Sequence, residues 1–237
     1  MWLLGFISTS LGFLIGGSFA WIFKGLQGKI DTIYAVCAGL ILGLISIEIF
    51  PEAIDLGGWF ISMMGLIVGG ITFYFIHNLL HHNYQLKSIS KKNMYIRTGL
   101  ILMLSLSIHN IPMGIMLGAS QKDGFTITIL QSLLFHSIPE GIILFTPLIV
   151  AGINMFIWLL ISLIVSVPVA FGVYIGDFIG VKHEITSAIL ISVTVGIMLL
   201  VTITEILFPS LKKSPTLRIV FYTLIGIGVM GLYLKIV

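Results

Sequence analysis

The stretch Ser105–Gly141, SLSIHNIPMGIMLGASQKDGFTITILQSLLFHSIPEG, contains one short pattern twice. HNIPMG at residues 109–114 is followed 27 positions later by HSIPEG at residues 136–141. Ser105 and Ser132 extend the match, because each serine lies one helical turn before its histidine. Both copies are embedded in long apolar runs, so polar side chains recur at corresponding positions of two neighbouring hydrophobic segments.

The composition around this stretch is that of an integral membrane protein. The chain has 237 residues, of which 58% are hydrophobic and 9% charged, and its mean hydropathy is +1.15. A soluble domain has roughly 25% charged residues, so this chain cannot cover itself with a solvated surface. The apolar runs do not alternate in polarity as barrel strands would, which predicts an all-α membrane bundle.

Eight apolar runs have about the 20 residues that a membrane-spanning helix needs. They leave almost nothing outside the membrane, and we therefore predict a single transmembrane domain over residues 1–237. The chain begins apolar without a basic segment, so the first run is interpreted as a span and not as a signal peptide. The eight predicted spans are residues 2–23, 30–54, 57–77, 95–119, 125–150, 155–178, 185–208 and 217–237.

The basic residues predict the orientation of these spans. Nine lysines and arginines fall in loops on one side and three on the other, and the richer side faces the cytoplasm. Both termini are then outside, in a multi-pass protein of the cell membrane. Lys87, Lys91 and Lys92 fit contact with anionic lipid headgroups. The short, scattered basic segments do not suggest nucleic-acid binding.

Pairs of glycines four residues apart recur along the spans and predict close helix packing. They do not distinguish packing within one chain from packing in a homodimer. The pairs are Gly12/Gly16, Gly39/Gly43, Gly65/Gly69, Gly114/Gly118 and Gly176/Gly180.

The duplicated pattern also predicts a site. His136 and Glu140 are four residues apart and share one helix face, and His109 has the matching place in the preceding span. If the two spans are neighbours, two imidazoles and one carboxylate converge. These are ligands that suit zinc and related divalent ions. The simpler alternative is a membrane histidine that is hydrogen-bonded to a neighbouring helix.

The paired motifs, in an eight-span chain with histidines between spans three and four, resemble the ZIP (Zrt/Irt-like) family of divalent metal transporters. The resemblance implies a 3+2+3 bundle, in which the first and last three spans are inverted repeats. It also implies transport, and not catalysis, of zinc, or of iron, manganese or cadmium, into the cytoplasm. The metal would be the transported substrate and not a cofactor.

Residue by residue, the resemblance assigns His109, Asn110, His136 and Glu140 to the metal site. Ser137 falls where family members often have a side chain that holds a second metal. Met113 stands where the family usually has a carboxylate, and Val167 stands where span six often has a glutamate. Glu205 in span seven is retained.

These departures leave Glu140 as the one firmly placed carboxylate. A dication in a low-dielectric cavity needs negative charge nearby, so we predict one metal ion and not two. Met113 is either a soft thioether ligand or a side chain that only fills space; the sequence leaves both open.

Other polar residues flank the centre. Glu48 and Glu205 lie deep in their runs and are candidates for the ion pathway. Glu52 and Asp55 fit ordinary solvation at the interface. His77, His81 and His82 are predicted to lie in the cytoplasmic loop, where they either bind metal or are simply solvated.

Two other functions stay open from the sequence. One is a family relative that binds metal without transporting it, and the missing carboxylates are the observation that supports it. An intramembrane zinc hydrolase would need the usual His-Glu-x-x-His spacing, which the chain lacks.

Overall fold

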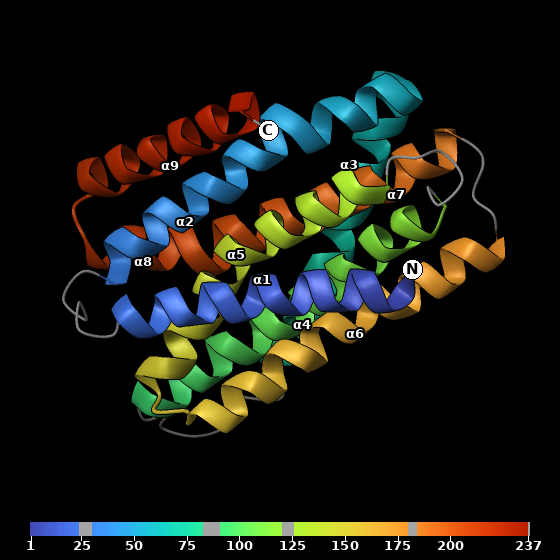
Figure 1. Ribbon diagram of the computed structural model, residues 1–237. Helices are drawn as coiled ribbons and strands as arrows, with labels where there is room; N and C mark the ends of the chain where they lie inside the picture. The colour runs from blue at the N-terminus through green and yellow to red at the C-terminus, as the bar shows by residue number, and fades with distance from the viewer. Residues whose placement is uncertain (24–29, 83–90, 120–125, 180–183, 237) are drawn as a thin grey trace. The chain divides into compact units, whose positions relative to one another are not determined.

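The computed structural model describes residues 1–23, 30–82, 91–119, 126–179 and 184–236, and every regular element in these ranges is a helix (Figure 1). Seven helices of the described part are long and apolar enough to cross a membrane. A chain in lipid satisfies its backbone hydrogen bonds internally, and long apolar helices do so. The prediction of an all-α, multi-pass membrane protein is confirmed.

The helices fall into two compact units. Unit 1 comprises Met1–Lys24 and Lys87–Ser187, and unit 2 comprises Gly25–Leu86 and Ala188–Val237. The first unit therefore combines the first helix with three from the middle of the chain. Its helices are α1 (Trp2–Phe23), α4 (Lys91–Ala119), α5 (Thr126–Val150) and α6 (Met155–Ile179).

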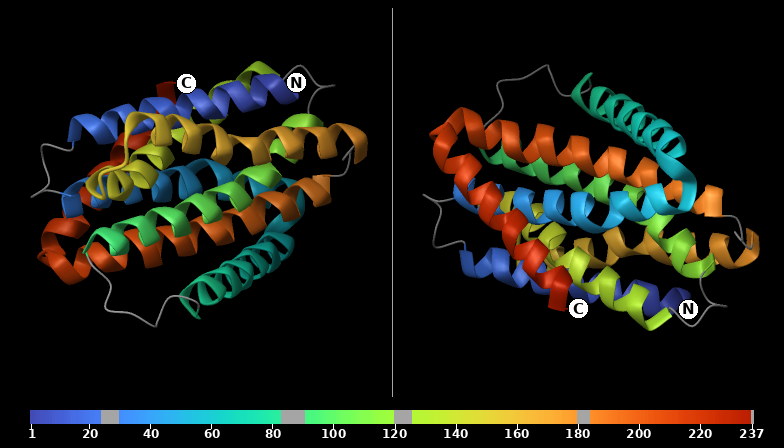
Figure 2. Two further views of the ribbon diagram at one scale, coloured as in Figure 1. Left: turned by 90° about the horizontal axis from the view of Figure 1, so that it is seen from below. Right: turned by 90° about the horizontal axis from the view of Figure 1, so that it is seen from above.

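In unit 1, glycines bring the backbones of paired helices together. A Cβ on Gly16 of α1 would overlap the Ile138 carbonyl of α5, and a Cβ on Gly114 of α4 would overlap the Val169 carbonyl of α6. Figure 2 shows these helices running beside one another. Without a side chain in the way, van der Waals contact between backbones can hold helices together in lipid.

A tight corner joins α5 to α6. The N–H of Ile153 donates to Leu148 and that of Gly152 to Ile149, with Gly152 at φ 90°, which is a Schellman ending that favours glycine. Asn154 then caps α6, because its Oδ1 accepts the Ile157 N–H at 2.8 Å.

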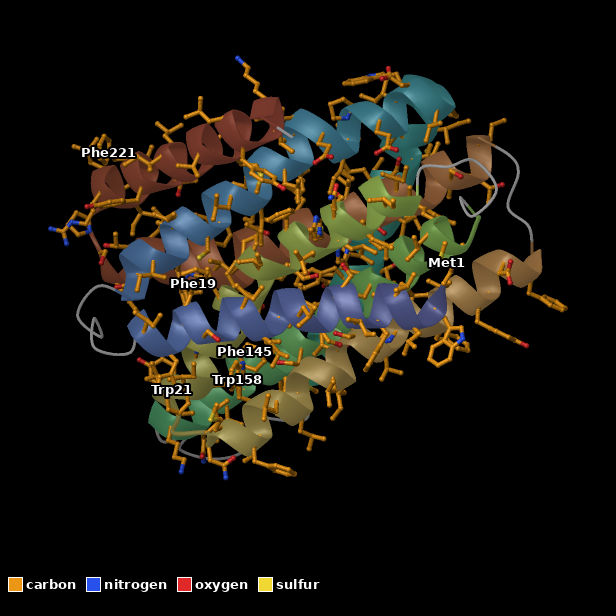
Figure 3. The ribbon with its side chains drawn as sticks, in the orientation of Figure 1. Met1, Phe19, Trp21, Phe145, Trp158 and Phe221 are labelled. Carbon is orange, nitrogen blue, oxygen red and sulfur yellow. The ribbon has the colours of Figure 1, made fainter. Side chains whose placement is uncertain are left out.

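Two rings pack across this corner. Phe145 and Trp158 meet edge to face with ring centroids 6.3 Å apart (Figure 3). This ring contact links the end of α5, the helix that carries HSIPEG, to the first turn of α6.

Unit 2 contains the remaining helices and uses the same packing device. A Cβ on Gly39 of α2 would overlap the Thr223 carbonyl of α9, and one on Gly69 of α3 would overlap the Val193 carbonyl of α7. The elements are α2 (Ile30–Leu44), π-helix η2 (Ile45–Ile49), α3 (Phe50–His82), α7 (Glu184–Val201, whose first residues belong to unit 1), π-helix η4 (Thr202–Leu207), α8 (Phe208–Lys213) and α9 (Thr216–Ile236).

These contacts show packing within one chain for the described glycine pairs. Gly180 lies outside the described residues. The homodimer alternative stays a prediction.

The second and third predicted spans form one continuous apolar segment, Asp31–Phe75, which has 45 residues. The backbone breaks inside α3 at Gly58, where φ is 73° and ψ is 166°. This conformation is essentially restricted to glycine. Figure 2 shows that the chain changes direction along α3. The prediction of eight spans in a 3+2+3 arrangement, and of a single domain, stays a prediction.

The helix ends differ from several predicted span boundaries. The backbone break falls at Gly58, close to the predicted gap between residues 54 and 57, and α3 continues to His82, so the backbone of His77, His81 and His82 is helical where a loop is predicted. Polar residues such as histidine differ little from apolar ones in helix propensity, so they do not by themselves end the helix that the apolar residues before His77 begin. The seventh run extends through η4 and α8 to Lys213.

We expect Gly114→Ala to destabilise unit 1. The added methyl would collide with the Val169 carbonyl, and overpacking of this kind costs about 1–3 kcal/mol. Thermal unfolding of the purified protein measures the effect as a lower Tm. Gly228→Ala is the matched control, because a Cβ there meets nothing within 4 Å. Equal Tm values for the two variants would contradict the packing argument.

Candidate metal centre

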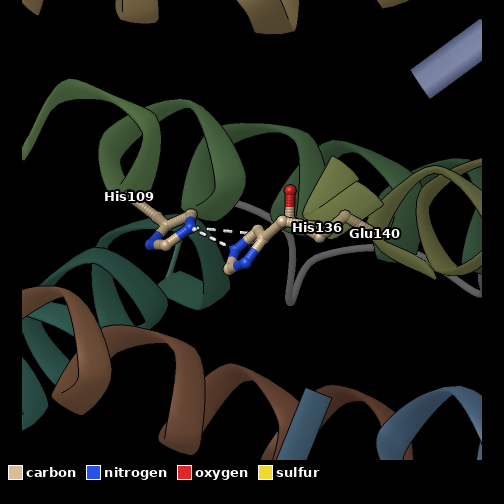
Figure 4. Close-up of side chains that lie close together, drawn as sticks. All are labelled: His109, His136 and Glu140. Atoms are coloured by element: carbon tan, nitrogen blue, oxygen red, sulfur yellow. Dashed lines mark hydrogen bonds and ion pairs between the residues drawn. The ribbon is translucent and has the colours of Figure 1, made fainter. Parts of the chain in front are cut away.

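Helices α4 and α5 of unit 1 bring the two sequence motifs together. His109 lies on α4, and His136 and Glu140 lie one turn apart on α5. Figure 4 shows the two imidazole rings facing each other, with Glu140 beside them. The rings are nearly parallel, at 13°, with centroids 5.3 Å apart. The two motifs are therefore neighbours in the described structure, which is the condition that the sequence sets for a shared site.

The three side chains present one ligand atom each at almost equal spacing. His109 Nε2 lies 3.2 Å from His136 Nε2, and the Oε1 atom of Glu140 lies 3.3 Å from the first and 3.2 Å from the second. Two ligands of a tetrahedral zinc ion, each about 2.0–2.1 Å from the metal, are about 3.3–3.4 Å apart. The triangle therefore has the size of one face of a zinc coordination tetrahedron.

The centre is dry. His109, His136 and Glu140 are 1%, 4% and 0% exposed. Oε1 of Glu140 is close to both imidazoles but lacks hydrogen-bond geometry to either, and among the described groups Oε2 has no hydrogen-bond partner. A buried carboxylate without partners is costly, and a bound cation would supply what it lacks. The arrangement fits a site for a metal ion.

Asn110 and Ser137 stand beside the triangle but are tied into the fold. The amide nitrogen of Asn110 donates to the Val165 carbonyl of α6 at 2.9 Å. The hydroxyl of Ser137 donates to the Leu133 carbonyl one turn earlier at 2.8 Å. These structural bonds, and the single carboxylate, are consistent with one ion at the centre. A ligand role for Asn110 and Ser137 stays a prediction.

Met113 contacts an apolar cluster. It packs against a group of buried side chains from three helices of unit 1: Leu117, Leu133, Val169 and Val173. Of the two interpretations that the sequence leaves open, these contacts favour a side chain that fills space.

Two other predicted residues meet in unit 2. Nδ1 of His77 lies 2.9 Å from Oε1 of Glu205, which is only 9% exposed and belongs to η4. The sequence does not indicate this contact, because the two residues lie far apart in the chain. Glu48 lies in the other π-helix, η2, and is partly buried. The side chains of His81 and His82 lie outside the described residues.

Sequence reasoning missed the Val165 carbonyl, which orients Asn110. A backbone oxygen carries no residue-type signal, and only the packing of α4 on α6 reveals it. The sequence identifies Ser105 as part of the repeat, but it does not reveal that the serine hydroxyl is buried without a hydrogen-bond partner among the described groups.

A family model described as ZIP zinc transporter matches residues 85–234, which is more than half of the chain and includes both motifs. No curated protein matches the chain.

We expect the purified protein to bind one zinc ion per chain. Glu140→Gln should remove tight binding, because it takes away the only carboxylate of the cluster while keeping the shape of the side chain. Calorimetry and metal analysis measure both quantities. Two tightly bound ions per chain, both lost in Glu140→Gln, would contradict a single-ion centre.

Proposed function

We propose that this chain, which belongs to the ZIP zinc transporter family, carries a divalent metal ion across the membrane into the cytoplasm through the centre formed by His109, His136 and Glu140. Zinc is the proposed substrate, with iron, manganese and cadmium as the alternatives. The observation that carries the proposal is the triangle of ligand atoms, buried in a membrane helix pair and sized for a tetrahedral ion.

The donor set favours transition metals over alkaline-earth ions. Two imidazole nitrogens and one carboxylate oxygen suit zinc and its neighbours, whereas calcium and magnesium prefer oxygen ligands alone. All three ligands belong to unit 1, so one compact body supplies them.

For the path through the membrane we infer eight crossings. A helix of 45 residues would be about 68 Å long at 1.5 Å per residue, whereas the hydrocarbon core is about 30 Å thick. Asp31–Phe75 is therefore long enough for two crossings, and the break at Gly58 is the turn between them. The excess of basic residues on one side then supports termini outside the cell membrane.

On this topology, His77 and Glu205 lie toward the cytoplasmic ends of their helices and are proposed to line the exit of the pathway. An imidazole and a carboxylate 2.9 Å apart can share an ion in passing. Glu48 is proposed to line the entrance. Glu48 and Glu205 both lie in π-helical segments, η2 and η4, each of which ends shortly before a proline. π-Helical segments are frequent at functional sites.

A hydrolase is the weaker proposal. A zinc hydrolase generally needs a general base besides the metal ligands. The described cluster offers one carboxylate, which the metal site itself uses.

We expect proteoliposomes that contain the chain to take up zinc, and Glu140→Gln or His136→Ala to reduce the rate at least tenfold. Asp177→Asn is the matched control, since it also removes a carboxylate from unit 1, but an exposed one. Zinc binding without flux in the unmodified chain would instead identify a metal-binding protein that does not transport.

The rate should fall as the pH falls from about 7.5 to 5. An imidazole must be neutral to bind metal, so protons compete with the ion at His109 and His136. Zinc flux measured at subsaturating zinc, with equal pH on both sides, tests this. A rate that is independent of pH in this range would count against the two histidines as ligands.

A further inference from the structure

Two buried polar atoms that lie one helical turn apart on α4 lack hydrogen-bond partners in the described structure. One is the hydroxyl of Ser105, which is 1% exposed, and the other is Nδ1 of His109, whose side chain is also 1% exposed. Many other serines and threonines in these helices donate to the carbonyl four residues earlier, as Ser10 and Thr146 do. An unsatisfied buried polar group costs about 1–3 kcal/mol, so two of them in one turn of helix call for an explanation.

The two atoms are placed to meet. Ser105 and His109 are four residues apart on one helix, and such side chains are neighbours. Side chains in a helix lean toward its N-terminus, so the His109 ring leans over the turn that contains Ser105. Nε2 of His109 reaches across to α5, which leaves Nδ1 as the ring nitrogen nearer to its own helix.

Metal binding gives this pair a chemical role. When Nε2 of a neutral imidazole binds a metal ion, the ring proton must be on Nδ1. A metal-bound histidine almost always donates that N–H to an acceptor, and losing the acceptor typically weakens metal binding 10–100-fold. A serine hydroxyl can accept such a bond after rotation about one side-chain torsion.

We propose that Ser105 is the positioning residue of the metal centre, whose Oγ accepts the Nδ1–H of His109 when Nε2 holds the ion. The inference rests on the proposed metal site and names what orients one of its ligands. The hydroxyl and Nδ1 both lack a hydrogen-bond partner among the described groups, and ion binding would satisfy both.

The test measures zinc affinity and stability together in the purified full-length chain. Ser105→Ala should weaken zinc binding about tenfold or more. It should not lower the Tm of the metal-free protein, because the substitution removes an unsatisfied buried group and no hydrogen bond. Ser105→Thr keeps a hydroxyl and should restore the affinity to within about threefold of the original.

Ser10→Ala is the matched control. Ser10 is also a buried serine of unit 1, but its hydroxyl donates to the Phe6 carbonyl at 2.7 Å. It should leave zinc affinity unchanged. Unchanged affinity in Ser105→Ala, or an equal loss in both alanine variants, overturns the proposal.

Two spectroscopic measurements separate positioning from direct ligation. With zinc bound and histidine labelled with ¹⁵N, the Nδ1–H of His109 should exchange slowly with water, and faster in Ser105→Ala. The visible absorption of bound Co²⁺ should keep its band positions in that variant; shifted bands would make Ser105 a metal ligand and overturn the positioning role. If the unmodified chain bound no zinc at all, the proposed function would fail, which is a different outcome from normal binding in Ser105→Ala.

Discussion

The rest of unit 1 depends on holding one carboxylate and two imidazoles together away from the protein surface. Glu140 is fully buried, and within the described residues the groups that lie closest to its carboxylate are His109 and His136. Removing a carboxylate from water costs several kcal/mol unless charge or hydrogen bonds replace the lost solvation. An imidazole in its neutral form would replace little of it. A bound cation would replace it, which is why the centre suits a metal ion.

The surrounding helices hold these three side chains at their observed spacing by close backbone contact. Gly114 lets α4 approach α6, and Gly16 lets α1 approach α5. With α4 pressed onto α6, the Asn110 amide reaches the Val165 carbonyl and fixes the turn of helix that carries His109. A Cβ at either glycine would overlap a carbonyl oxygen of the facing helix, so a helix that carries one of these side chains would have to shift. The glycines thus help to set the positions of the site residues by allowing the helices to approach closely.

The charge of the centre shapes its chemistry. One carboxylate and one dication leave a net positive charge, which argues against a second ion nearby. Asn110 and Ser137, the neighbours that would have to hold it, are engaged in bonds to backbone carbonyls. A modest net attraction also suits a transported ion, since an ion that is bound too tightly would not leave. A site of this kind selects by ligand type and geometry more than by charge.

The sequence by itself determined the class of the protein and identified the three residues that the structure brings together. The scarcity of charge and the length of the apolar runs require membrane helices, because lipid cannot solvate exposed backbone. The repeat of His-x-Ile-Pro-x-Gly located His109, His136 and Glu140, because polar groups deep in apolar runs are expensive and rarely incidental. These inferences depend on residue type and spacing along one helix, which the sequence contains directly.

Only the tertiary structure decided which helices are neighbours and how far their atoms are apart. The meeting of His77 with Glu205, the bond from Asn110 to Val165 and the packing of Met113 on an apolar cluster all join residues that are distant in the chain or face in directions the sequence does not specify. The unpartnered hydroxyl of Ser105 belongs to the same class. In lipid, a helix has no solvent-facing side to orient it, so its rotation and its partners are set by packing and not by amphipathic pattern.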